Sequence, residues 1–316
     1  MPVNLRYSIW KVLAYFDLFH YPVSRQEIFS FLDQPVTPEA LTETLQGMLE
    51  EKSVFMFGEY YSIHNDDGRV LRRIEGNCRA QPLLRTGSRI SRFLYQVPYV
   101  RAIGISGSLS KNFAAEDADI DYFIITRANR LWVARTMMHV FKKISFLFGR
   151  QHWYCMNYYI DEEALEIEEK NLYTAIELIT LVPVCGNGIL HEFFRKNSWT
   201  GGFYPNYRLK ITDMDFRRGD SGIKRMLESV FNGRLGDWLD NFLMRVTSRR
   251  WEKKEAFEKR SVKGNRMGLK TGKHFSKPNP VFFQKDILDL YGDNLSRLYR
   301  NTRHPAGRVR FFSSDK

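Results

Sequence analysis

The chain has 316 residues, 43% hydrophobic and 27% charged, which is typical of folded globular domains and excludes a disordered protein. Its length allows two or three domains. The three cysteines are too few and too widely spaced for a disulfide framework, and no apolar run approaches the roughly 18 residues of a membrane span, so we expect a cytoplasmic protein without a membrane partner.

The net charge of +12 is unevenly distributed. Residues 1–65 contain four Lys and Arg against eight Asp and Glu, a balance of −4, so the rest of the chain carries +16. We therefore expect any polyanionic partner to bind beyond residue 65.

Residues 1–65 have the pattern of a winged-helix-like domain. Apolar residues at helical spacing over 5–19 predict a first helix, Ser24 and Glu27 form a capping box for a second, and Thr37-Pro38 opens a third. A turn at Gly58-Glu59 predicts a hairpin.

The third of these helices argues against DNA binding. It carries Glu39, Glu43, Glu50 and Glu51 but no Lys or Arg, so it would be repelled by the phosphate backbone. We expect no duplex DNA binding through 1–65 and a role in protein contact or packing instead.

Three further segments follow along the chain. Residues 66–98 predict an arginine-rich helical connector of one or two helices. Residues 99–215 alternate predicted strands with helices: the strands cover 99–105, 120–126 and 152–160, and the helices cover 129–149 and 172–182. Residues 216–316 predict a helical and basic region ending in a helix over 284–301.

The most informative motif lies between the first two predicted strands. Gly107-Ser108 is followed by ten residues and then by Asp119 and Asp121. Side chains two apart on a strand share a face, so both carboxylates can converge on one hard cation such as Mg²⁺, which prefers carboxylate oxygens together with substrate phosphates. Gly107 allows a close approach of the backbone, and Ser108 adds a hydroxyl and an N–H group at a predicted helix start.

At these residues the chain resembles the DNA polymerase β-like nucleotidyltransferase superfamily, whose motif is Gly-Ser, about ten residues, then Asp-apolar-Asp. The resemblance implies an α+β protein with a mixed central sheet and a reaction that uses an NTP with Mg²⁺ or Mn²⁺. It assigns Asp119 and Asp121 to metal binding and catalysis. It assigns Gly107, Ser108 and Lys111 to nucleotide binding.

Superfamily members commonly carry a third acid on the next strand. Here that strand offers Asn157 in its middle and acids only at its end, Asp161 and Glu162. Asn157 cannot accept a proton at neutral pH. Three interpretations stay open: an enzyme with a displaced third acid, an enzyme with two acids, or a nucleotide-binding relic.

Residues 249–277 contain eleven Lys and Arg against three Glu, and glycines interrupt the segment. We predict a loop or tail over 263–280 that binds RNA, another polyanion or the triphosphate itself, with a solvated surface as the alternative.

The sequence thus favours an Mg²⁺-dependent nucleotidyltransferase that transfers a nucleoside monophosphate from an NTP to an unidentified acceptor and releases pyrophosphate. The alternative is a non-catalytic nucleotide-sensing or regulatory protein.

Overall fold

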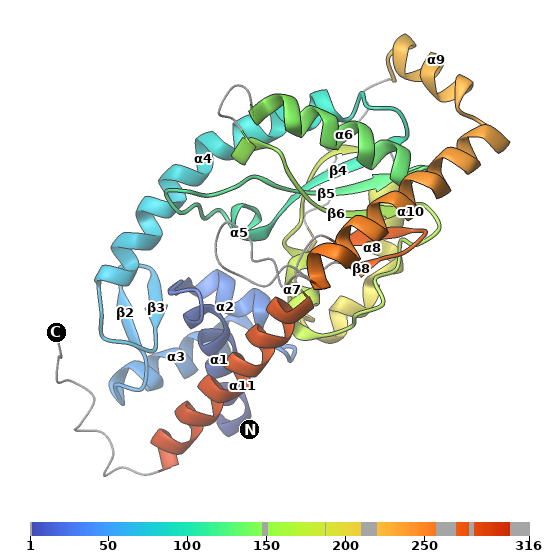
Figure 1. The fold of residues 1–316 in the computed structure, drawn as a ribbon. Coiled ribbons are helices and arrows are strands. Elements are labelled where there is room, and N and C mark those ends of the chain that lie inside the picture. Colours follow the sequence, from blue (N-terminus) through green and yellow to red (C-terminus); the bar gives the residue numbers. More distant parts are fainter. Residues whose placement is uncertain are drawn as a thin grey trace. The chain divides into compact units, whose positions relative to one another are not determined.

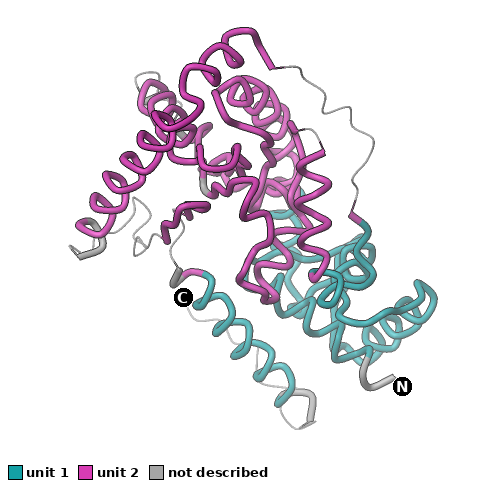
Figure 2. Tube along the Cα trace, turned by 90° about the vertical axis from the view of Figure 1, so that its right-hand side faces the viewer, with its two compact units in different colours: residues 1–74, 200–208, 284–316 teal, residues 75–199, 209–283 magenta. Residues whose placement is uncertain are grey.

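The computed structural model describes residues 2–146, 151–186, 188–209, 220–256, 270–277 and 281–303. Two compact units divide the chain (Figure 2). The first unit contains residues 1–74, 200–208 and 284–316, and the second contains 75–199 and 209–283. This division differs from the predicted boundaries at 65, 98 and 215. The helix α4 (Gly68–Leu94) lies between the first two, and the division between the units falls inside it, after Ile74. Residue 215 lies outside the described residues.

The first unit contains the predicted helices and hairpin. Its elements are α1 (Pro2–Asp17), β1 (Val23–Ser24), α2 (Arg25–Phe31), α3 (Pro38–Glu50), β2 (Phe55–Phe57) and β3 (Tyr60–Ser62). The strands form an antiparallel sheet in the order β1-β3-β2. Ser24 and Glu27 form the predicted capping box, and Thr37 caps α3. Glu39, Glu43 and Glu50 of α3 are exposed, as expected for an acidic outer face.

The C-terminal helix α11 (Val281–Arg303) belongs mostly to the first unit rather than to a separate C-terminal region. The rings of Tyr15 and Tyr291 lie 6.0 Å apart, and the Asn294 amide donates to the carbonyl of Ala14 at 3.1 Å. The two ends of the described chain therefore stabilise the same core.

The second unit is built on a mixed sheet in the order β7-β4-β5-β6-β9-β8 (Figure 1). Its strands are β4 (Val100–Ser106), β5 (Asp121–Thr126), β6 (Cys155–Asp161), β7 (Val182–Gly186), β8 (Lys270–Thr271) and β9 (Phe275–Lys277). β5 and β6 are parallel, and the other neighbouring pairs are antiparallel. The chain is therefore a mixed α+β protein with a mixed sheet, as predicted.

Each face of this sheet has its own helices and its own core. α4 and α6 (Leu131–Phe146) pack over Tyr122 and Ile124 of β5. On the other face, α7 (Leu172–Ile179) and α8 (Ile189–Lys196) pack over Phe123 and Ile125. Because side chains alternate along a strand, Asp121 at the start of β5 belongs to the face covered by α7 and α8.

Three strands of this sheet were not predicted, and neither was β1 of the first unit. The predicted helix over 172–182 ends at Ile179 and is followed by β7, which pairs with β4. The segment predicted as a loop over 263–280 contains β8 and β9, which extend the sheet beyond β6. Strands of two to five residues are stabilised by pairing with distant strands, which local periodicity does not report. In the described part of the chain, no helix is both long and apolar enough to cross a membrane.

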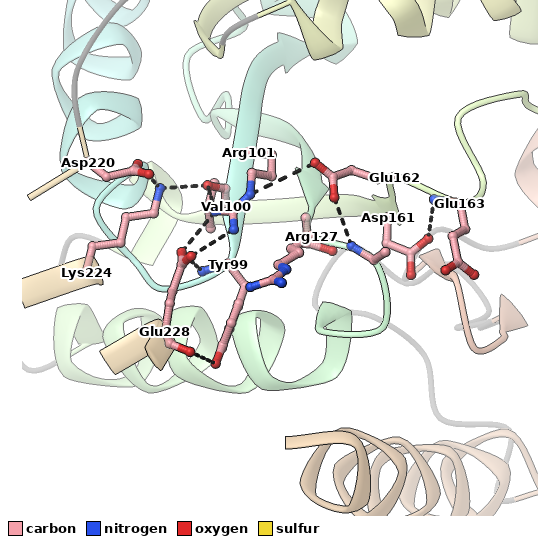
Figure 3. Close-up of polar contacts among 12 residues, drawn as sticks. Tyr99, Val100, Arg101, Arg127, Asp161, Glu162, Glu163, Asp220, Lys224 and Glu228 are labelled. Carbon is pink, nitrogen blue, oxygen red and sulfur yellow. Dashed lines mark hydrogen bonds and ion pairs between the residues drawn. The ribbon is translucent and has the colours of Figure 1, made fainter. Parts of the chain in front are cut away.

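A buried ionic network holds α9 (Gly222–Val230) against the start of β4 (Figure 3). The side chain of Lys224 is completely buried, and its amine donates to the carbonyls of Tyr95 and Val100 at 2.9 and 2.8 Å and pairs with Asp220 at 2.7 Å. The carboxylate of Glu228 accepts hydrogen bonds from both guanidinium NH₂ groups of Arg101, at 2.9 and 2.8 Å. This network orders the segment that enters the sheet.

Tyr99 is the strained residue of this network. Its φ of +69° is a conformation that non-glycine residues rarely adopt. Its N–H group donates to Glu228 at 2.7 Å, and its hydroxyl donates to the Glu228 carbonyl at 3.1 Å. Glu228 therefore stabilises both a partly buried cation, Arg101, and an unfavourable backbone conformation.

We predict that Glu228→Ala lowers the free energy of unfolding by about 3 kcal/mol or more, because it leaves Arg101 and the Tyr99 N–H group without their acceptor. Although burial opposes the effect, hydrogen bonds from Arg101 and from the Tyr99 backbone lower the pKa of Glu228, so this stabilisation should be lost as the pH falls through the acidic range. Urea unfolding measures the change. Glu192→Ala, which removes an exposed partner of Arg195, is the control and should change the stability much less, because water screens this pair; equal effects would contradict the prediction.

The N-terminus of α6 is capped from another helix. Asp240 of α10 (Arg234–Ala256) is buried and accepts from the Val133 N–H group at 2.9 Å. Burial raises the pKa of Asp240 to about 6, despite the helix N–H groups that favour its charged form.

A raised carboxyl pKa predicts a defined pH dependence. Between pH 4 and 6 the unfolded chain releases the Asp240 proton while the folded protein retains it, so the contribution of Asp240 to the free energy of unfolding should fall by about 3 kcal/mol as the pH rises. In Asp240→Asn this fall should be absent, because asparagine still accepts a hydrogen bond but does not titrate. Urea unfolding at several pH values checks both proteins, and an unchanged slope in the variant would show that other groups cause it.

Candidate active site

The candidate site lies where β4 ends and β5 begins. β4 leads directly into the short helix α5 (Gly107–Ser110), and its last residue, Ser106, pairs with Asp121. Gly107 has a φ of +69°, and a Cβ atom placed on it would lie 2.4 Å from Asp121 Oδ2. The structure therefore brings the Gly-Ser turn and the second aspartate of the motif into direct contact.

Two side-chain hydrogen bonds to the Gly107 carbonyl hold the Gly107-Ser108 turn in place. The carbonyl of Gly107 accepts from the Ser110 hydroxyl at 2.8 Å and from the Lys111 amine at 3.1 Å. Ser108 is exposed, and its hydroxyl donates to no other described residue. Because α5 has only four residues, this turn offers individual N–H and hydroxyl groups to a ligand rather than a helix dipole.

Lys111 is not a free cation. Its amine lies 2.8 Å from Glu177 Oε1 on α7, and the lysine side chain is mostly buried. Its predicted contact with nucleotide therefore requires Glu177 to share or release the amine. Glu177 was missed in the sequence, where nothing links it to the motif.

Asp119 does not lie on the strand, contrary to the prediction, because β5 begins at Asp121. The intervening Ile120 is nevertheless held by backbone hydrogen bonds: its N–H group donates to the His152 carbonyl at 3.0 Å, and its carbonyl accepts from Cys155 at 3.2 Å. The carboxylate of Asp119 lies 2.8 Å from His152 Nδ1. The loop before β6, rather than the strand pleat, positions the first aspartate.

Both aspartates act on the thiol of Cys155, the residue of β6 that is in register with Asp121. Burial, followed by the charge of Asp121, raises the pKa of Cys155 to about 12, with a smaller contribution from Asp119. The thiol therefore stays protonated and donates a hydrogen bond to Asp121.

Tyr173 of α7 shares this environment. Burial raises the pKa of its hydroxyl, and the carboxylates of Glu177 and Asp121 add to the effect. The edge of its ring meets Phe283 at a centroid distance of 6.2 Å. His152, Cys155, Tyr173 and Glu177 come from three separate segments, and only the β5–β6 register and the packing of α7 bring them to the motif.

Asp161 and Glu162, the candidates for a third acid, lie at the other end of the sheet. In the parallel register Asp121 is opposite Cys155, whereas Asp161 is opposite Thr126, five residues along β5 and therefore about 16 Å away. Neither acid reaches Asp119 or Asp121 from there. Asn157 lies at the register shift of β6, between Met156 and Tyr158.

Both distant acids have structural partners. Asp161 is completely buried and accepts from the N–H groups of Asn129 and Glu163, each at 3.0 Å, and its carboxylate lies 2.8 Å from His274 Nδ1. Glu162 lies beside Arg101 of the buried ionic network (Figure 3). These acids stabilise the loop between β5 and α6.

Within the described residues, no three His, Cys, Asp or Glu side chains are grouped to hold a metal ion by themselves. Asp119 and Asp121 therefore belong to no such group in the part of the chain that the structure describes. No protein-family model, no curated protein and no solved structure matches the chain.

We predict that Gly107→Ala displaces the Asp121 carboxylate, because the new methyl group needs the space of Oδ2. NTP binding, measured by titration calorimetry, should weaken at least about tenfold. Gly58→Ala is the matched control: Gly58 also has a positive φ, of +61°, but nothing lies within 4 Å of its Cβ position. Both variants should lose about 1–2 kcal/mol of stability from backbone strain. Unchanged NTP binding in Gly107→Ala would contradict the proposed turn.

Proposed function

We propose that the chain is an Mg²⁺-dependent nucleotidyltransferase that transfers a nucleoside monophosphate from an NTP to an unidentified acceptor and releases pyrophosphate. The observation that carries the proposal is the direct contact between Gly107 and Asp121, which joins a phosphate-binding turn to an acidic pair. The mixed sheet that supports both, with β4 antiparallel and β6 parallel to β5, is consistent with a polymerase β-like domain.

The donor set fits a divalent cation that binds together with its substrate. Mg²⁺ takes one or two carboxylates and completes its octahedral shell with waters and substrate phosphates, so a third protein ligand is not required. Asp119 and Asp121 would hold the ion. When bound, Mg²⁺ or Mn²⁺ supplies Lewis-acid stabilisation of the phosphate charge. Metal binding should accordingly be weak without NTP.

The other groups have separate roles. The Gly107 backbone and the Ser108 hydroxyl bind the terminal phosphates, and Lys111 provides a positive charge behind the turn. His152 orients the carboxylate of Asp119, and Cys155 orients that of Asp121.

A second candidate function is suggested by β6, the strand that pairs with β5. Cys155, rather than a carboxylate, is in register with Asp121, and its protonated thiol cannot act as a general base. This arrangement favours a non-catalytic nucleotide-sensing protein. One measurement distinguishes the two functions. An enzyme and a sensing protein would both bind Mg²⁺ and NTP, but only the enzyme would transfer a labelled nucleotide to an acceptor.

The acceptor could be a polyanion such as RNA, bound through 249–277. In the described ends of this segment, Lys270 and Lys277 are paired with Glu169 at 3.3 and 2.5 Å. Arg249, Arg250, Lys253 and Lys273 are exposed. Lys263 and Arg266 lie outside the described residues.

Replacement of either aspartate tests the proposal. Asp119→Asn and Asp121→Asn should each reduce transfer of labelled nucleotide in cell extract with Mg²⁺ or Mn²⁺ by about a thousandfold, because each removes a metal-binding charge at constant volume. NTP affinity should fall much less. Glu116→Gln, an exposed acid of the same loop, is the control and should retain activity. Near-normal transfer in either aspartate variant would exclude this site, and NTP binding without transfer in the wild type would establish the sensing alternative.

A further inference from the structure

Arg135 of α6 is a buried cation without a carboxylate partner among the described residues. Only 4% of its surface is exposed, and it makes no hydrogen bond or ion pair with a described residue. Burial lowers the pKa of its guanidinium, and Tyr159 is the one described group whose charge opposes that shift. Arginine keeps its proton even when buried, so the positive charge remains in the core.

Two buried hydroxyl groups also lack a partner among the described residues: that of Tyr159, whose ring contacts Arg135, and that of Ser276, which pairs with Tyr159 across the strands. Tyr159 of β6 and Ser276 of β9 are completely buried, and Tyr159 Oη and Ser276 Oγ have no hydrogen-bond partner in the described part of the chain. The two residues are directly opposite in the antiparallel β6–β9 pairing, so their side chains point to the same face of the sheet. The Arg135 guanidinium lies 6.0 Å from the centre of the Tyr159 ring.

Aromatic contacts alone do not explain this arrangement. The guanidinium also lies 5.4 Å from the Trp132 ring, but cation–π attraction is smaller than the cost of burying an unpaired charge. The indole N–H group of Trp132 already donates to the carbonyl of Gly272 at 3.2 Å. The neighbourhood therefore offers unused donors to a group that brings negative charge.

We propose that Arg135, Tyr159 and Ser276 form a binding site for a small oxyanion, a phosphate group, between α6 and the β6–β9 strand pair. A guanidinium provides two parallel N–H donors that match two phosphate oxygens, and the two hydroxyl groups can donate to the others. A bound anion would neutralise the core cation and satisfy all three side chains, and it would tie the β8–β9 hairpin to the rest of the sheet.

This site is separate from the proposed nucleotide site. Tyr159 belongs to the core beneath α4 and α6, whereas Asp121 is on the face covered by α7 and α8. Along β6, Tyr159 is four residues beyond Cys155, which corresponds to about 13 Å. Phosphate binding at Arg135 can therefore be measured independently of nucleotide binding at Gly107 and Ser108.

Thermal unfolding of the full chain in inorganic phosphate, against sodium chloride of equal ionic strength, tests the proposal. Phosphate at a hundredfold excess over its Kd should raise the Tm by about 5 °C and the effect should saturate. The Asp121→Asn variant should show the same shift, which distinguishes this site from the nucleotide site. A shift that is lost in Asp121→Asn, or no shift in the wild type, would overturn the proposal.

Arg135→Met provides the decisive comparison. The variant should lose the phosphate shift and, without phosphate, should unfold at the same Tm as the wild type or higher, because an uncompensated charge has been removed. Arg250→Met, an exposed arginine, is the matched control and should retain the shift. Tyr159→Phe, which removes only the hydroxyl, should weaken phosphate binding about fivefold. A lower Tm of Arg135→Met without phosphate would show instead that a carboxylate of the chain itself pairs with Arg135.

Discussion

The arrangement of the candidate site depends on one strand register, the pairing of Ser106 with Asp121. This pairing places the last residue of β4 beside the first of β5, so the turn at Gly107 meets a carboxylate as soon as the chain leaves the sheet. A shift of one residue would turn Asp121 toward the core under α4 and α6, where a carboxylate has no place. The buried Tyr122, Ile124, Phe123 and Ile125 oppose such a shift, because each would exchange one packed face for the other.

The two ends of the sheet differ in character. Near Tyr99 and Asp161, the buried side chains of Lys224, Glu228 and Asp161 are hydrogen-bonded, and they hold irregular backbone in place. Near Asp121, side chains are partly exposed, and the hydroxyl of Ser108 has no partner among the described residues. A rigid end that supports a more open end is the organisation expected of a binding site on a stable scaffold.

Local features of the sequence were sufficient for the elements and for the motif. The capping box at Ser24, the hairpin at Gly58 and the strands around Gly107 and Asp121 all depend on neighbouring residues, and all are present. The third acid could not be judged in the same way. Only the β5–β6 register shows that Cys155 lies beside Asp121 and that Asp161 does not. The two paired strands are separated by α6 in the chain, so local patterns do not reveal this register. Glu177, Tyr173 and the short strand β9 could not be predicted for the same reason, because their positions depend on contacts between distant parts of the chain.

The pairing of β9 with β6 also has a consequence for biosynthesis. The edge of β6 is completed by residues 275–277, more than a hundred positions later in translation, and the first unit needs α11, which ends at Arg303. Neither unit can finish folding until β9 and α11 have left the ribosome. An unpaired strand edge is a template for misassociation, and the nascent polypeptide carries an exposed β6 edge while more than a hundred further residues are made.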